Sequence, residues 1–470
     1  MITIFNVGKK DIGLSYIAYF LRFFSSIIIL PFLLSSLTKS EYAIWNIFLA
    51  INTFVVLFDM GYGVVISRYA MYAYSGVKES ELETLKDIKG SDEPNYYYLY
   101  QIMIAAKKIY SRISTIVIFV LIIMTMYILH IANNNLSTSQ VVISWLIFSL
   151  SVYFNMFILS EATIIKGLGM IKELQVITIT NTLFSIISKI VLLKLGYNLI
   201  GLSIAYLITS ILLTIQYFKI TNKIRKIKFA DYNKALKTFD DQFKRTFKII
   251  TSKSKGIGGV LISNFIQNQL FLLIAPLYLS LEVVGSYGLS WQLVSVIGAF
   301  SSVPFNTYLM KMGNLIVKDD KKKLKEVFSI STFIFVSFFV LGAFILTLFG
   351  ADVLKLFNSN TKILPFIPLT VMILQGYIVQ SIQKSTNIIS LTNEQSYVKA
   401  LVISSIVTIS LQMIIFNTYP NLTYLLLCNV LIQVSYNLWR WSKASMDICG
   451  VTYKTIIQVP ITKLITYICK

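Results

Sequence analysis

Residues 113–131 read ISTIVIFVLIIMTMYILHI, and residues 140–160 read QVVISWLIFSLSVYFNMFILS. Neither stretch contains a Lys, Arg, Asp or Glu. Each is close to the roughly 20 residues that a helix needs to cross about 30 Å of hydrocarbon. Because no water satisfies backbone polar groups at that depth, each stretch must be helical. The pair therefore predicts two membrane spans joined by a short turn.

The remainder of the chain repeats this pattern. Of its 470 residues, 56% are hydrophobic and 13% are charged, and its mean hydropathy is +0.72, whereas soluble chains carry about 25% charged residues. We expect an all-α polytopic membrane protein with about 12 transmembrane helices, in two six-helix halves around a central cavity. The expected spans lie near 12–36, 43–67, 113–131, 140–160, 174–196, 199–218, 256–279, 284–309, 328–349, 363–388, 398–416 and 422–441.

The distribution of Lys and Arg predicts how the spans are oriented in the membrane. With the N-terminus inside, cytoplasmic segments and adjoining span ends hold 36 of the 42 Lys and Arg residues, and the outer side holds 4. By the positive-inside rule both termini are then cytoplasmic. The net charge of +21 is thus explained by a basic cytoplasmic face that lies beside anionic inner-leaflet lipids. No nucleic-acid partner is expected.

The longest polar segment between expected spans lies at the middle of the chain. We therefore expect an N-terminal half over 1–218, a basic cytoplasmic linker over 219–255, a C-terminal half over 256–441 and a cytoplasmic or interfacial tail over 442–470. Six spans return the chain to the inside, which predicts parallel repeats with the substrate site between them.

An internal register supports the two halves. Sliding the chain by 245 residues places the first span on the seventh. Identical residues in this register include Phe20 with Phe265, Pro31 with Pro276 and Tyr42 with Tyr287. The alternative is that any two membrane hairpins resemble each other.

Polar residues inside the first and seventh spans fall at matching depths. Arg22 lies near the middle of the first span, and Tyr19 shares its helical face. The register places Asn264 and Gln267 at the same points, with Asn268 beside them. A charge at mid-bilayer normally faces a cavity or a partner, so we expect these residues to line a hydrated substrate cavity. The alternative for Arg22 is an arginine that snorkels to the interface.

Two lysines extend this set of candidate binding residues. Lys189 lies midway along the expected span 174–196, and Lys384 belongs to a polar stripe in the tenth span. Part of that stripe is also explained by helix–helix hydrogen bonding. Cations outnumber acids in the spans, which favours an anionic substrate such as a phosphate or pyrophosphate.

The acids near the spans are Asp59 and Glu161, both toward the inner ends. Either is a candidate for proton or cation coupling. For Asp59 the alternative is an interfacial acid paired with a nearby Lys or Arg.

Signals of enzymatic chemistry are missing from the sequence. The chain has one histidine, His130, and three cysteines without metal-ligand spacing, namely Cys428, Cys449 and Cys469. No Gly-rich phosphate loop follows a strand. We expect neither an enzyme nor a bound metal or cofactor, apart from H⁺ or Na⁺ that drives transport.

The segment 31–75, PFLLSSLTKSEYAIWNIFLAINTFVVLFDMGYGVVISRYAMYAYS, resembles the second-span region of bacterial polysaccharide flippases. In that family a tyrosine in the outer turn precedes an Asp-x-Gly-aromatic-Gly sequence and then an arginine. The matching residues here are Tyr42, Asp59, Gly61, Tyr62, Gly63 and Arg68.

This resemblance implies a member of the multidrug/oligosaccharidyl-lipid/polysaccharide exporter superfamily, within the O-antigen or capsule-unit flippases of lipopolysaccharide and polysaccharide biosynthesis. Such proteins move an undecaprenyl-pyrophosphate-linked oligosaccharide from the cytoplasmic to the periplasmic leaflet, alongside other polysaccharide assembly proteins. The family's cationic cavity residues map onto Arg22, Lys189 and Lys384.

Two other functions remain open at this point. A cation-coupled drug or metabolite antiporter of the same superfamily would need acids in its cavity. A membrane polysaccharide polymerase would need a sizeable outer loop, and the longest one expected here is 350–362. A relative of the lipid II flippase would need two further C-terminal spans, which 442–470 cannot supply.

Overall fold

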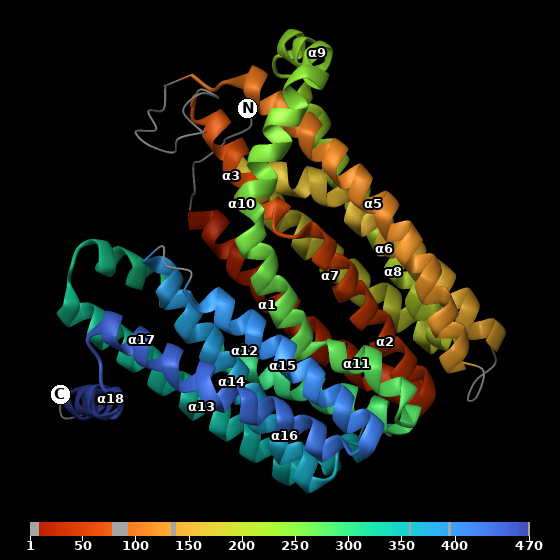
Figure 1. The fold of residues 1–470 in the computed structure, drawn as a ribbon, viewed down its shortest axis with the longest axis vertical. Helices are drawn as coiled ribbons and strands as arrows, with labels where there is room; N and C mark the ends of the chain where they lie inside the picture. The colour runs from red at the N-terminus through yellow and green to blue at the C-terminus, as the bar shows by residue number, and fades with distance from the viewer. Residues whose placement is uncertain (1–8, 78–92, 133–137, 357–358, 393–395, 469–470) are drawn as a thin grey trace. The chain divides into compact units, whose positions relative to one another are not determined.

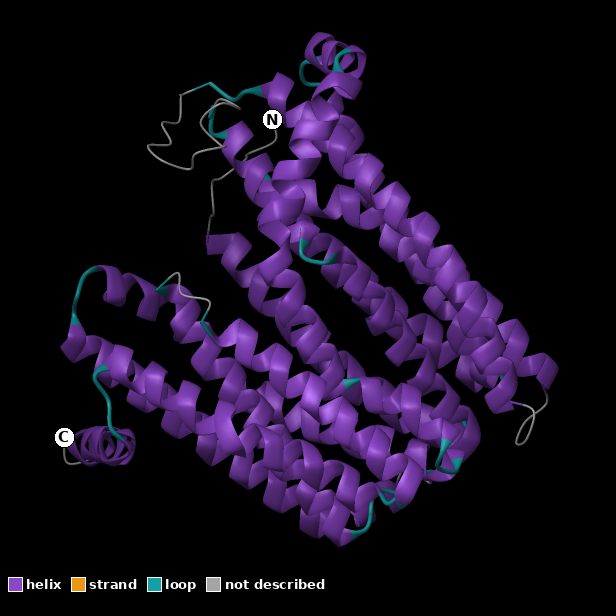
Figure 2. Cartoon of the chain, in the orientation of Figure 1, coloured by secondary structure: helices purple, strands orange, loops and turns teal. Residues whose placement is uncertain are grey.

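The computed structural model describes residues 9–77, 93–132, 138–356, 359–392 and 396–468, with some side chains in these ranges left out. The described residues form helices and no strand (Figure 2). The all-α prediction is therefore confirmed. The chain forms two compact units, Met1–Phe265 (unit 1) and Ile266–Lys470 (unit 2).

Unit 1 is a bundle of long helices. Within it, α6 lies between α5 and α8, and α1 packs along α7 (Figure 1). Its elements are α1 (Lys9–Ser36), α2 (Lys39–Val56), η1 (Leu57–Asp59), α3 (Tyr62–Tyr74), α5 (Tyr96–Ala132), α6 (Thr138–Gly167), α7 (Ile171–Lys194), α8 (Asn198–Arg225), α9 (Phe229–Lys237) and α10 (Phe239–Asn268), which continues into unit 2.

Unit 2 is a second bundle, in which α12 packs against α13 and α14 (Figure 1). Its elements are α11 (Leu270–Ile274), η2 (Ala275–Leu277), α12 (Leu281–Val317), α13 (Lys321–Leu356), α14 (Phe366–Leu391), α15 (Tyr397–Thr418), α16 (Leu422–Ile432), the π-helical turn η3 (Gln433–Leu438), α17 (Trp439–Cys449) and α18 (Tyr453–Ile468).

The number of candidate membrane spans is close to the predicted one. Ten helices of the described residues are long and apolar enough to cross a membrane, and the pair Gly258–Asn268 and Leu270–Leu277, bent by 59°, makes an eleventh. In α1 the apolar stretch, Phe24–Ser36, is shorter than these spans. A fold of about 12 helices in two halves is consistent with this set.

Local sequence signals explain where α2 begins. Thr38 has extended backbone angles, and its hydroxyl accepts a hydrogen bond from the Glu41 backbone N–H at 3.2 Å. The Glu41 carboxylate in turn accepts from the Thr38 backbone N–H at 2.9 Å. This reciprocal capping box satisfies two donors that a helix start leaves free.

Two expected spans differ in the structure, which corrects the sequence prediction. The second span runs over Lys39–Asp59 and ends inside the expected 43–67, because Met60 (φ 44°) and Gly61 (φ 81°) adopt left-handed angles before α3 begins. The span 256–279 breaks at Gln269. Hydropathy does not report where the backbone changes direction, so neither the helix junction nor the break was predicted.

The segment 219–255, expected as a linker, is mostly helical, since α8 extends to Arg225 and α9 and α10 fill most of the remainder. Because polar residues such as Lys and Asp are compatible with exposed helices, polarity alone did not identify this segment as helical.

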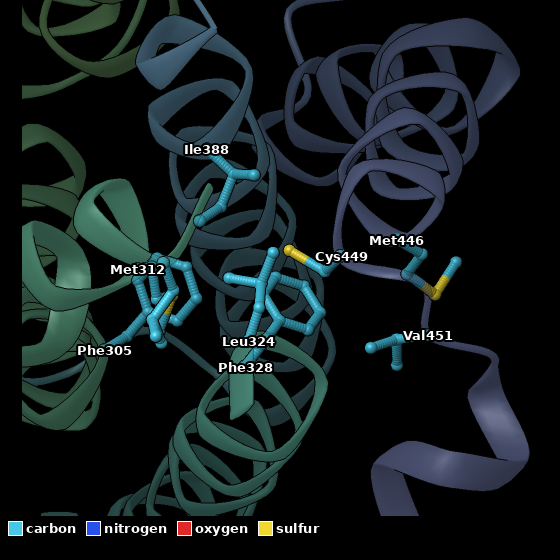
Figure 3. Close-up of a cluster of buried hydrophobic side chains, with 9 residues drawn as sticks. Phe305, Met312, Leu324, Phe328, Ile388, Met446, Cys449 and Val451 are labelled. Carbon is cyan, nitrogen blue, oxygen red and sulfur yellow. The ribbon is translucent and has the colours of Figure 1, made fainter. Parts of the chain in front are cut away.

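The C-terminal segment is joined to unit 2 by an apolar cluster (Figure 3). Cys449 and Val451, which flank the turn between α17 and α18, are 0% and 5% exposed. The cluster connects α12, α13, α14 and α17 through Phe305, Met312, Leu315, Leu324, Phe328, Ile388, Met446, Cys449 and Val451. The placement of the tail against lipid stays a prediction.

Helices α3 and α6 approach each other closely through small residues. A Cβ atom added to Gly167 would lie 2.3 Å from the Ser67 carbonyl oxygen and 2.8 Å from the Ala70 Cβ. Small residues at a helix interface permit this close backbone contact in membranes.

We expect the Gly167→Ala variant to be destabilised by about 1–3 kcal/mol, because the added methyl group forces two backbones apart. The measurement is the melting temperature of the detergent-purified protein. Gly313→Ala is the control, since its added Cβ would lie 3.3 Å from Leu391 Cδ2, the end of a side chain that can turn away. Equal losses in the two variants would contradict the backbone contact as the cause.

Candidate functional site

A polar cavity of about 370 Å³ lies inside unit 1. Helices α1, α2, α6, α7 and α8 all contribute to its wall. Its polar lining consists of Ser25, Asn52, Asn155, Asn181, Thr182, Ser185, Lys189, Tyr206, Thr209 and Ser210. Amides and hydroxyls thus dominate the polar part of a cavity in an otherwise apolar bundle, which is the usual setting for a binding site between helices.

Lys189 is the cation among the residues that line this cavity. Its ammonium nitrogen lies 5.7 Å from the centre of the Tyr206 ring, within range of a cation–π contact. The Tyr206 hydroxyl accepts a hydrogen bond from Asn52 Nδ2 at 3.2 Å. No carboxylate occurs among the residues that line the cavity. The lysine therefore keeps an electrostatic preference for an anion.

The cavity also presents a free hydrogen-bond acceptor. The Asn181 Oδ1 atom is buried and has no hydrogen-bond partner within the part of the chain that the structure describes. A buried polar atom without a partner is costly, so it favours a ligand or water that donates to it.

Lys384 lines a different cavity, inside unit 2. Its ammonium nitrogen lies 4.6 Å from the Phe335 ring centre and 5.5 Å from that of Phe305. The structure thus assigns the two predicted lysines to separate cavities, one in each unit. Whether either binds substrate stays a prediction.

Gln267 belongs to a hydrogen-bond network at the break between α10 and α11. Its side chain donates to Ser405 Oγ at 3.2 Å. Its backbone carbonyl accepts from Gln375 and Asn429, both at 3.3 Å. Because a helix break frees carbonyl groups that lipid cannot satisfy, these side chains supply the missing donors.

The other residues predicted on α10 and α1 differ in their surroundings. Asn264 is exposed, whereas the Asn268 Oδ1 atom is buried without a partner among the described residues. Tyr19 and Arg22 lie on α1, but their side chains are outside the described part. Their roles in substrate binding stay predictions, as does that of Gln267.

Asp59 lies at the junction between α2 and α3, at the end of η1. Its carboxylate accepts hydrogen bonds from the Tyr110 hydroxyl and from the Gly63 backbone N–H, the latter at 3.1 Å. An acid in this position stabilises the start of α3. A Cβ on Gly63 would lie 3.0 Å from both the Tyr110 hydroxyl and Thr163 Cγ2, so a glycine is needed there.

Tyr62, the aromatic residue of the Asp-x-Gly-Tyr-Gly motif, packs on α10. Its hydroxyl lies 3.2 Å from Thr251 Oγ1, and its ring stacks on Phe247 with centroids 6.4 Å apart. Every residue of the motif except Met60 thus has a local structural role. Ion coupling by Asp59 stays a prediction.

Glu161 forms an ion pair with Arg225. The Arg225 Nη2 to Glu161 Oε1 distance is 2.6 Å, and the Glu161 side chain is 4% exposed. Arg225 also donates to Asn222 at 2.8 Å. The pair connects the C-terminal part of α6 to the end of α8.

Sequence reasoning overlooked Asn52, Asn155 and Asn181 as wall residues. The sequence signal that could have identified them is that each is a single amide side chain within an apolar span. Which face of each helix turns inward depends on packing, however, and hydropathy does not report it.

The fold of this chain is similar to the folds of two solved membrane proteins. The first is a structure described as the inward-facing conformation of a multidrug resistance MATE family transporter of the MOP superfamily. The identity is 11% and the TM-score 0.63, over 92% of this chain and 96% of the other.

A second similar structure is that of the lipid II flippase MurJ in an inward closed conformation. Its identity is 14% and its TM-score 0.56, over 97% of this chain and 91% of the other. No family model matches the sequence, and no curated protein sequence is similar to it. At these identities the comparisons establish the fold alone.

We expect Glu161→Gln to lower the stability by about 3–5 kcal/mol, because it leaves Arg225 without its buried partner. The double variant Glu161→Leu/Arg225→Met removes both charges and should recover most of the loss. Melting temperatures of the three purified proteins measure this. A single variant as stable as the parent would contradict a structural role for the pair.

A second pair of variants tests the cap on α3. Asp59→Asn keeps an oxygen that can accept from Gly63 and Tyr110, so its stability should stay close to that of the parent. Asp59→Ala loses both bonds and should lose about 1–2 kcal/mol. Melting temperatures decide between these outcomes, and an Asn variant as unstable as the Ala variant would rule out the cap.

Proposed function

We propose that this chain is a flippase that moves an undecaprenyl-pyrophosphate-linked oligosaccharide, an O-antigen or capsule repeat unit, from the cytoplasmic to the periplasmic leaflet by alternating access. The observation that carries the proposal is the wall of the unit 1 cavity. It combines one lysine with many amides and hydroxyls, and it contains no carboxylate among its lining residues.

The charge of the cavity selects among substrates. Inside the membrane an ammonium group interacts strongly with nearby charges, because the surroundings screen it weakly. Lys189 therefore attracts a phosphate or pyrophosphate and repels a cationic drug. This favours an anionic lipid-linked substrate over the cations expected of a drug antiporter.

The uncharged groups suit a sugar. Sugar hydroxyls both donate and accept hydrogen bonds, and the cavity offers Asn52, Asn155 and Asn181 together with serine and threonine hydroxyls. The unpartnered Asn181 Oδ1 is an acceptor for a hydroxyl donor. A cavity of about 370 Å³ has the size of a small-molecule site and accommodates part of such a head group.

For the antiporter alternative, the two acids predicted for ion coupling both have partners among the residues that the structure describes. Glu161 is paired with Arg225, and Asp59 accepts bonds that stabilise α3. The comparisons do not separate the two functions, because one similar structure is described as a flippase and the other as a multidrug transporter. The charge of the cavity is what favours the flippase.

We expect Lys189→Gln to lower the amount of full-length surface polysaccharide at least about tenfold, because one charge-assisted contact is lost. Lys189→Arg keeps the charge and should retain most of the activity. The measurement is the surface polysaccharide of a strain whose own copy is deleted, normalised to the amount of membrane-inserted protein.

The matched control is Lys172→Gln, since Lys172 is exposed on the same helix, α7, and does not line the cavity. It should behave as the parent. Wild-type polysaccharide in the Lys189→Gln strain would disprove the assignment. Drug resistance that depends on the chain, with unchanged polysaccharide, would instead support the antiporter.

A further inference from the structure

The cavity of about 540 Å³ inside unit 2 is separate from the proposed transport site in unit 1. It lies among α13, α14, α17 and the C-terminal helix α18. Its volume is typical of a ligand site. Most of its wall is apolar, and this part consists of Phe328, Phe333, Val336, Tyr377, Leu438, Trp439, Met446, Ile456 and Ile457.

Three hydrogen-bond donors in this wall lack an acceptor. Lys384 contacts the faces of aromatic rings, and no ion pair joins it to a carboxylate among the residues that the structure describes. The hydroxyls of Thr332 and Ser381 are buried without a hydrogen-bond partner in the same part of the chain. Both residues are 6% exposed. Such groups are costly to bury, so the cavity favours a ligand rich in acceptor oxygens.

The depth of Lys384 indicates where that ligand comes from. Lys384 lies seven residues before Leu391, the end of α14, which is about 10 Å along the helix axis. The distribution of Lys and Arg places this end on the cytoplasmic side. Basic pockets between spans on that side are suited to anionic lipid head groups.

The mouth of the cavity has the character of a membrane interface. Tyr453 at the start of α18 is 67% exposed, and Trp439 at the start of α17 is 50% exposed. Tyrosine and tryptophan favour the level of lipid head groups, since one end is apolar and the other polar.

We propose that this cavity binds an anionic phospholipid of the inner leaflet. The phosphate oxygens accept from Lys384, Thr332 and Ser381, and one acyl chain lies against the apolar wall beneath α18. The bound lipid joins α18 to α13 and α14, in addition to the apolar cluster around Cys449. This site is independent of the transported substrate.

The test measures lipid binding to the purified, delipidated full-length protein by native mass spectrometry. The probes are phosphatidylglycerol and phosphatidylcholine with identical acyl chains. We expect one phosphatidylglycerol to bind at least about tenfold more tightly than phosphatidylcholine, because only the former carries a net negative charge that Lys384 can offset. Lys384→Gln should abolish this preference.

Two further variants keep the result interpretable. Lys399→Gln removes an exposed lysine of α15 that does not line the cavity, and it should bind as the parent does. Val336→Trp fills the apolar part and leaves Lys384 in place, so it should weaken phosphatidylglycerol binding at least about tenfold if an acyl chain occupies the space. Melting temperatures without lipid establish that each variant is folded.

Three outcomes would overturn the proposal. Equal binding of the two lipids would remove the role of charge, and unchanged binding by Lys384→Gln would remove the role of that residue. Displacement of phosphatidylglycerol by farnesyl diphosphate, a short polyprenyl diphosphate, would assign the cavity to the transported lipid instead. None of these outcomes depends on the flippase assay, so the two proposals succeed or fail separately.

Discussion

The fold depends on one constraint, which is that lipid cannot satisfy backbone polar groups. An unbroken helix satisfies its own backbone groups, but the junction before α3 and the break between α10 and α11 interrupt this pattern. At the junction the Asp59 carboxylate accepts from the Gly63 backbone N–H, and at the break the Gln267 carbonyl accepts from Gln375 and Asn429. Polar side chains near the junction and the break are therefore first of all replacements for missing backbone partners, and this limits which of them are available for a ligand.

Charged side chains are divided in the same way. Glu161 and Asp59 are held in bonds that connect helices, whereas Lys189 and Lys384 lie against aromatic rings in cavities without lining carboxylates. The lining of these two cavities is thus cationic although the bundles contain both signs of charge. This local separation of charge, more than the net charge of +21, is the basis of the proposed preference for anions.

Much of the fold was predictable because a span is a property of a continuous stretch. The apolar runs, the approximate number of helices and the position of Lys189 within a span all follow from such local signals. The helix junction before α3 did not, because left-handed angles at Met60 and Gly61 leave little trace in hydropathy. The Glu161–Arg225 pair joins positions 64 residues apart, and the inward faces of Asn52 and Asn155 are set by packing, so neither could be identified before the helices were placed.

The Asp59 to Gly63 motif has a consequence for how proteins of this kind are classified. Its acid and glycines serve a helix junction, and its tyrosine packs on α10. A signature built on these positions would recover proteins that share the architecture regardless of cargo. Prediction of the substrate from sequence would need a different set of positions, namely those that line the cavities, such as Asn52, Lys189 and Lys384.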